Sequence, residues 1–149
     1  MRRVVLIAAI VAGVTCGLTS VPAGAASPAN YGTRCVTVHS AVHDRSGTIC
    51  AQLGVMTGAK RSEVTFATSY GTLASVSVKT LELLLNGKVV STLHNATKDV
   101  ATIIPPITDN WWDEPAGGEQ AAVSQACMTW PDGDQACTGS GWLYSLPYP

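Results

Sequence analysis

Apolar and polar residues alternate along much of the chain, and this alternation predicts β-strands. Around Val64 and Phe66, and again around Val76 and Val78, every second residue is apolar, which is typical of a strand with one buried face. No window of a dozen residues has the spacing of an amphipathic helix. With about seven such segments, the pattern predicts an all-β fold, an antiparallel β-sandwich that is immunoglobulin-like in architecture.

One of these segments changes its phase. Val76 and Val78 share one face, whereas Leu81, Leu83 and Leu85 lie on the opposite phase. This change predicts a bulge near Lys79-Thr80, or a strand that passes from one sheet to the other. Asn86-Gly87 follows between apolar runs, and this dipeptide predicts a two-residue hairpin turn.

The N-terminus has the pattern of a secretory signal peptide, and the pattern looks bacterial. Arg2 and Arg3 precede an apolar run from Val4 to Val14, and small residues lead to a cleavage site near Ala25. The run is shorter than the roughly 20 residues that cross a bilayer. We therefore expect a secreted, extracellular protein without a transmembrane span. Its parts are a signal peptide (residues 1–25), a flexible lead (26–33) and a single β-domain (34–149).

The cysteines of the mature chain form an even set, because Cys16 lies in the signal peptide. An even number of cysteines in an oxidising compartment favours disulfides. Pro131-Asp132-Gly133 predicts a turn midway between Cys127 and Cys137, so the strands leaving the turn bring the two cysteines together. Cys35 and Cys50 flank another turn-rich interval, and both fall on the phase of their strands that points away from the core. A bridge between neighbouring strands requires this arrangement. We predict two local hairpin disulfides, Cys35–Cys50 and Cys127–Cys137.

One long bridge from Cys50 to Cys127, as in immunoglobulin domains, is the alternative pairing. Those domains carry a Trp on the third strand and a Tyr two residues before the second cysteine. This chain has Phe66 and Gln125 at the corresponding places. The pattern therefore favours the local pairs, while the wider sandwich architecture is expected in either case.

The interval from Cys35 to Cys50, followed by Ala51-Gln52-Leu53, resembles the first cysteine pair of secreted bacterial subtilisin inhibitors. That family consists of small disulfide-bonded α+β proteins with an exposed reactive loop, so the resemblance implies an inhibitor of extracellular proteases. The second cysteine pair departs from the family because it encloses far fewer residues, and no reactive-site residue is transferred. Met128-Thr129-Trp130, beside the third mature cysteine, is the candidate exposed loop for an inhibitor.

Composition and charge argue against several classes of function. Charged residues make up 13% of the chain, the formal net charge is −1, and no basic cluster is present, which argues against nucleic-acid binding. His39, His43 and His94 lack the spacing of a zinc site, and the acidic runs at 109–119 and 132–134 do not match a calcium-binding loop. We expect no metal, no cofactor and a monomer.

The segment from Pro105 to Glu119 is the candidate binding loop. Neighbouring side chains of an extended segment point in opposite directions, so Trp111 and Trp112 cannot both enter a core. One of them is then available to stack on a sugar, an aromatic ring or a cation, which makes this pair the expected ligand-binding residues. Ile103-Ile104, just before the segment, predicts a short edge strand.

These features predict a secreted, non-catalytic binding module whose extracellular ligand is a glycan, a cell-wall component or a protein. An inhibitor of extracellular proteases is the first alternative. A small secreted hydrolase is the second alternative: the Gly-x-Ser-x-Gly motif is missing, but a dispersed Ser-His-Asp triad is recognised by geometry rather than by sequence. We expect no catalytic residues.

Overall fold

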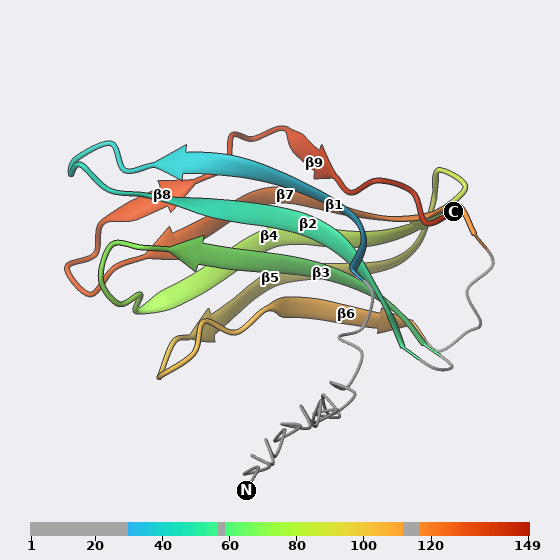
Figure 1. Ribbon diagram of the computed structural model, residues 1–149, viewed down its shortest axis with the longest axis horizontal. Coiled ribbons are helices and arrows are strands. Elements are labelled where there is room, and N and C mark those ends of the chain that lie inside the picture. Colours follow the sequence, from blue (N-terminus) through green and yellow to red (C-terminus); the bar gives the residue numbers. More distant parts are fainter. Residues whose placement is uncertain (1–29, 57–58, 112–116) are drawn as a thin grey trace, which may run out of the picture.

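The computed structural model describes residues 30–56, 59–111 and 117–149, which form an antiparallel β-sandwich (Figure 1). The first sheet has the strand order β1-β2-β3-β6, and the second has the order β5-β4-β7-β8, with β9 also paired to β7. The first sheet contains β1 (Asn30–His39), β2 (Ser46–Met56), β3 (Ala59–Thr68) and β6 (Ile107–Trp111). The second contains β4 (Ser75–Leu85), β5 (Lys88–Asp99), β7 (Glu119–Thr129), β8 (Gln135–Cys137) and β9 (Trp142–Tyr144). The predicted all-β sandwich is confirmed.

Two expectations about strand positions are wrong. Ile103-Ile104 is not a strand, and the strand that follows it is β6, which pairs with β3. β1 begins at Asn30, so residues 30–33, expected in a flexible lead, belong to the first sheet. The predicted signal peptide lies outside the described residues. Within the described ranges, no helix is long and apolar enough to cross a membrane.

The core lies between the two sheets and is built from alternating positions of the longer strands. The alternating residues Val64, Phe66, Val76 and Val78 lie in it, as the sequence pattern predicted. Met128 and Trp130 are also core residues, so the expectation that Met128-Thr129-Trp130 forms an exposed reactive loop is wrong. The main core residues are Val38, Ile49, Ala51, Val64, Phe66, Leu73, Val76, Val78, Leu81, Ile107, Val123, Ala126, Met128 and Trp130.

The predicted phase change in β4 is present, since both Val78 and Leu81 are buried. Its cause differs from both explanations. β4 stays within one sheet, and its register against β5 and β7 is the same before and after Lys79, so no residue is inserted there. Lys79 lies at the level of Asn95 in β5 and Gln125 in β7, and these two residues have positive φ angles of 48° and 39°. The three strands therefore change phase together.

The Asn86-Gly87 hairpin turn joins β4 to β5, as predicted. Asn86 has a φ of 49° and Gly87 a φ of 76°. Positive φ at both central residues is the requirement of the type I′ turn, whose twist matches that of the flanking strands. The turn therefore sets the start of the pairing between β4 and β5.

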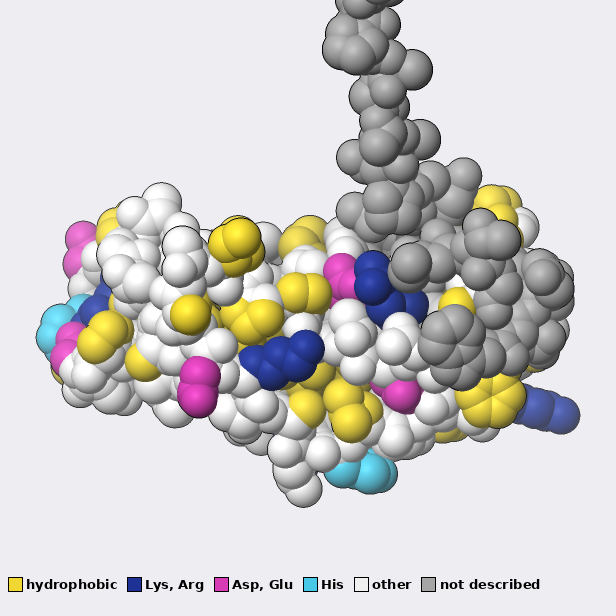
Figure 2. Space-filling model, turned by 90° about the horizontal axis from the view of Figure 1, so that it is seen from below, with side chains coloured by type: hydrophobic (Ala, Val, Ile, Leu, Met, Phe, Trp, Pro, Cys, Tyr) yellow, Lys and Arg dark blue, Asp and Glu magenta, His cyan; other side chains and the backbone are white. Residues whose placement is uncertain are grey.

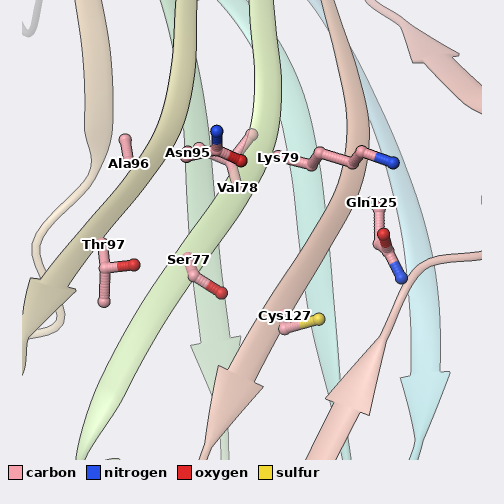
Figure 3. A pocket seen from close by; sticks show the side chains of 8 residues that line it. All are labelled: Ser77, Val78, Lys79, Asn95, Ala96, Thr97, Gln125 and Cys127. Carbon is pink, nitrogen blue, oxygen red and sulfur yellow. The ribbon is translucent and has the colours of Figure 1, made fainter.

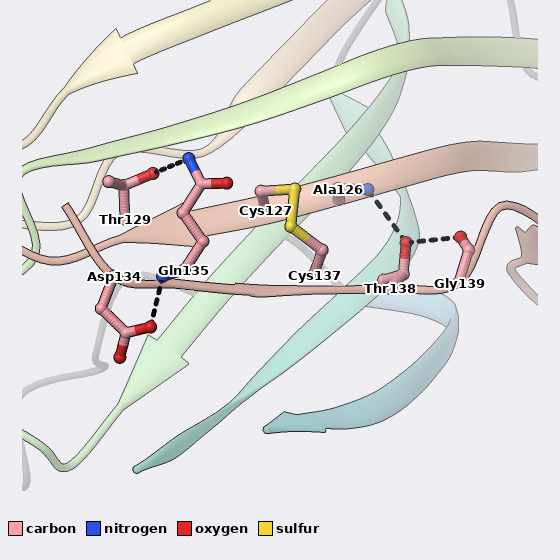
Figure 4. The surroundings of a disulfide bond; sticks show 8 residues. All are labelled: Ala126, Cys127, Thr129, Asp134, Gln135, Cys137, Thr138 and Gly139. Atoms are coloured by element: carbon pink, nitrogen blue, oxygen red, sulfur yellow. Dashed lines mark hydrogen bonds between the residues drawn. A yellow bond between two sulfur atoms is a disulfide. The ribbon is translucent and has the colours of Figure 1, made fainter. Parts of the chain in front are cut away.

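Both predicted disulfides are confirmed. Cys35 lies directly opposite Cys50, and Cys127 directly opposite Cys137, with Cα–Cα distances of 4.0 and 4.1 Å. The Cys50–Cys127 alternative is thereby excluded. Hydrogen bonds on either side hold the second bridge in place: the Gln135 side-chain amide donates to Thr129 Oγ1, and the Ala126 N–H donates to Thr138 Oγ1 (Figure 4).

Arg45 ties the two disulfide-bonded hairpins together at one end of the sandwich. Its Nε donates to Asp134 Oδ2 at 2.7 Å, its Nη2 donates to Asp132, and its guanidinium lies 4.8 Å from the centroid of the Trp130 ring. The Ser40 hydroxyl donates to the Asp134 carboxylate at 2.7 Å. A single cation from the β1–β2 loop thus holds the turn between β7 and β8.

These contacts shift the pKa values of both carboxyls below their ordinary values. For Asp132, the hydrogen bond from Arg45 is the main cause of the lower pKa. For Asp134, burial is the largest single effect, and by itself it would raise the pKa. The hydrogen bonds from Ser40 and Arg45 and the smaller favourable contacts together outweigh burial, so the pKa is lowered. A carboxyl with a lowered pKa stabilises the fold above its ordinary pKa, and this stability is lost as the pH falls through the pKa of the folded state.

We predict that Asp134→Asn lowers the midpoint of urea-induced unfolding at pH 7. This deficit should begin to shrink as the pH falls below about 4, the ordinary pKa of an unfolded Asp, and should disappear as the pH passes the lower pKa of the native carboxyl. Unfolding curves at several pH values measure the difference. Asp44→Asn is the control, because Asp44 lies exposed in the same loop as Ser40 and Arg45. A deficit that stays constant down to pH 2 would show that the charge of Asp134 does not contribute.

A buried ion pair links the two sheets at the other end of β3. Lys60 Nζ lies 2.7 Å from Glu119 Oε1, and the side chains are only 3% and 1% exposed. Removing one member of a buried pair costs more than removing both, because a single substitution leaves a buried charge without its counterion.

Lys60→Met is therefore expected to lower the free energy of unfolding by about 3–5 kcal/mol. The double variant Lys60→Met, Glu119→Gln should recover a large part of this loss, as measured by urea unfolding. Lys88→Met, at an exposed position in β5, is the matched control. Equal losses in the single and double variants would contradict the role of the pair.

Candidate functional site

β9 adds two aromatic side chains to the outer face of the second sheet. Directly opposite residues of an antiparallel pair point to the same side. Trp142 lies opposite Ser124 and Tyr144 opposite Ala122, while Leu143 between them packs against the core. The Trp142 and Tyr144 side chains are 42% and 46% exposed, and their ring centroids are 6.4 Å apart with 32° between the planes. Together they form an exposed aromatic pair.

A hollow of about 340 Å³ lies on the same sheet, where the three strands change phase. Its lining comes from β4, β5 and β7, and Figure 3 shows Lys79 extending across β7 toward Gln125. The polar residues of this lining, which we call the polar hollow, are Ser77, Lys79, Asn95, Thr97 and Gln125.

The side chains of the polar hollow are not used by the fold. Within the part of the chain that the structure describes, none of the five forms a side-chain hydrogen bond or ion pair. This differs from the Arg45 cluster, where each polar group contacts another. Amides, hydroxyls and an ammonium group are therefore presented to the solvent, and they can bind a ligand without breaking an internal contact.

The polar hollow and the aromatic pair are adjacent because of the phase change. Gln125 directly follows Ser124 in β7, and Ser124 lies opposite Trp142. At the distortion, Ser124 and Gln125 lie side by side on the outer face, instead of alternating between the outside and the core as in a regular strand. The distortion thus places Gln125, which lines the hollow, on the same face as Ser124 and one residue from the position that pairs with Trp142.

The charges on this face are few and opposite in sign. Lys79 lies at the polar hollow, and Glu82 lies in β4 opposite Ala122, in the row that contains Tyr144. Figure 2 shows a different side of the sandwich, its lower edge in Figure 1, where Lys and Arg side chains are also few. No strong electrostatic field therefore favours a highly charged ligand here.

The structure places Trp111 in the other sheet. It ends β6 opposite Lys60, and its side chain is 38% exposed. Asp109, on the same phase of β6, accepts a hydrogen bond from Ser91 Oγ at 2.5 Å, so this phase turns toward β5 and the second sheet. Trp112 lies outside the described residues. Trp111 is therefore a separate candidate surface, and its role in binding remains a prediction.

Trp142 and Tyr144 are the residues that the sequence reasoning missed. Glycines at positions 139 and 141 precede this strand, and its three residues are too few for a clear alternation of apolar and polar positions. The order aromatic-Leu-aromatic in Trp142–Tyr144 was nevertheless a signal, because an extended segment turns residues i and i+2 to one face.

A serine, a histidine and an aspartate lie close together near Arg45, but not in the order that nucleophilic catalysis needs. His43 Nδ1 lies 3.4 Å from Asp134 Oδ2. The Ser40 hydroxyl donates to Asp134 rather than to His43, and it accepts the backbone N–H of His43. An activated serine must instead donate to the histidine. In the described ranges, no group of three or more His, Cys, Asp or Glu side chains is placed to hold a metal ion.

The outer face of the first sheet carries a second hollow of similar size. Short side chains line it, including Thr37, Thr48 and Thr68, and its lining contains no aromatic residue. The Thr68 hydroxyl already donates to the carbonyl of Ser46.

No protein-family model, curated protein or solved structure matches the chain. The function must therefore be inferred from the chemistry of the candidate sites.

Proposed function

We propose that the chain is exported from a bacterial cell by its N-terminal signal peptide, cleaved near Ala25, and acts outside the cell as a non-catalytic binding module. The charged, apolar and small-residue regions of the N-terminus support export. Two disulfides, each within a hairpin, suit an oxidising compartment.

The binding surface in this proposal is the outer face of the second sheet. The observation that carries it is the exposed pair Trp142 and Tyr144 on the same face as polar side chains that have no partner within the described chain, with Gln125 next to the residue that pairs with Trp142. Binding sites commonly combine apolar contact area with a few polar groups that fix the orientation of the ligand. Trp111 lies on the other sheet and is not part of the lining of either hollow described above.

The first test is retention of the purified mature protein on an insoluble cell-envelope preparation of the producing organism. We expect the double variant Trp142→Ala, Tyr144→Ala to bind about tenfold or more weakly, since each aromatic contact contributes about 0.5–1.5 kcal/mol in addition to the area that it buries. Both rings are exposed, so the thermal unfolding midpoint should change little.

Trp111→Ala is the matched control, because it removes one partly exposed ring from the other sheet. We expect it to retain binding. Loss of binding in Trp111→Ala, with full binding in the double variant, would assign the ligand to the end of β6 instead. Absence of retention of the unmodified protein would contradict the proposed function itself.

A further inference from the structure

We infer that the ligand of the outer face is a neutral glycan chain. This inference rests on the proposed binding function, and it specifies the ligand class of the same surface. Three properties of the surface carry it: two rings in succession, polar groups that both donate and accept, and little net charge.

The aromatic pair offers two neighbouring stacking positions. Trp142 and Tyr144 occupy successive outward positions of β9, and their planes differ by 32°. The faces of a pyranose ring expose apolar C–H groups, which pack against an aromatic ring and bury apolar area. Two rings along one strand suit two linked sugar units better than one. The tilt between them suits a chain whose successive units are not coplanar.

The polar hollow matches the hydroxyl groups of sugars. The Asn95 and Gln125 amides each carry donors and an acceptor, and the Ser77 and Thr97 hydroxyls can do both. A sugar hydroxyl also donates and accepts, so it can form a hydrogen bond with any of these groups, either as the donor or as the acceptor. The four strands from β9 to β5 span about 14 Å at the usual strand spacing, which is longer than a single sugar ring.

A peptide ligand fits this surface less well. An extended peptide usually binds by adding a strand to a free sheet edge. The edge of β7 next to the site is already paired, with β8 at Cys127–Thr129 and β9 at Ala122–Ser124. The free edge of this sheet is that of β5, which pairs only with β4 among the described strands and lies at the opposite edge from β9. A peptide added there would not reach the aromatic pair, so the surface that includes Trp142 and Tyr144 offers side chains rather than backbone groups. A polyanion is also disfavoured, because the charge of Lys79 is offset by that of Glu82 on the same face.

Titration calorimetry with defined probes tests this inference. The probes are neutral gluco-, xylo-, manno- and N-acetylglucosamine oligosaccharides from monosaccharide to hexasaccharide, polygalacturonate as a polyanion, and a pool of synthetic extended peptides. We expect at least one neutral series to bind, with an affinity that rises about tenfold or more from the monosaccharide to the tetrasaccharide and changes little with salt.

Variants then locate the binding. Trp142→Ala, Tyr144→Ala should lower the oligosaccharide affinity about tenfold or more, and Gln125→Ala several-fold, whereas Trp142→Phe should retain most of it because a stacking ring remains. Thr48→Ala, in the hollow of the first sheet, should leave the affinity unchanged. The Trp142→Phe result also separates loss of stacking from loss of folding.

Three outcomes would overturn the inference. Salt-sensitive binding of polygalacturonate alone would indicate a polyanion, and binding of peptides alone would indicate a protein ligand. Failure of every neutral series, with envelope retention that still depends on Trp142 and Tyr144, would refute the glycan while the proposed binding function stands. If envelope retention also fails, the proposed function is refuted with it.

Discussion

β4 is hydrogen-bonded on both sides, and this constraint governs the second sheet. A buried central strand must keep its backbone N–H and C=O groups paired. β4 can therefore change the face that it turns to the core only if β5 and β7 change with it. The positive φ angles of Asn95 and Gln125 occur at the level of Lys79, where this shared change takes place. The core continues on both sides of the distortion, and the outer face gains a hollow.

The disulfides and the Arg45 cluster act on the hairpins, and one bridge borders the hollow because Cys127 is part of its lining. Each bridge holds one hairpin, and Arg45 connects the turns of the two hairpins through Asp132 and Asp134. Closing a loop by a disulfide restricts the unfolded chain, while the ion pairs act on the folded state. These contacts secure one end of the sandwich. The five polar side chains of the hollow take part in none of them, so a ligand can bind these side chains without breaking a contact that stabilises the fold.

Local patterns in the sequence were sufficient for the fold class, the disulfides and the Asn86-Gly87 turn. Each of these depends on residues that are close in sequence or on a strict period of two. The strand β6 was missed because Pro105-Pro106 and the acidic residues obscure a short strand whose formation depends on pairing with β3. The inhibitor loop failed for a related reason: Met128 and Trp130 beside a cysteine resemble an exposed loop, but pairing with β4 turns Met128 into the core. The phase change in β4 was visible, but its cause involves three strands that are distant in sequence.

The candidate site combines these local and long-range effects. Trp142 and Tyr144 point to the same face because side chains alternate with a period of two along β9. Their position near Gln125 depends instead on the pairing of β9 with β7 and on the distortion that β7 shares with β4 and β5. Side chains on paired strands lose less freedom on binding than side chains on a mobile loop, because their backbone is already fixed. A ligand that contacts many weak polar groups benefits most from such preorganisation. This favours an extended ligand with repeated, similar groups, and it links the backbone distortion of the second sheet directly to the proposed recognition of a chain.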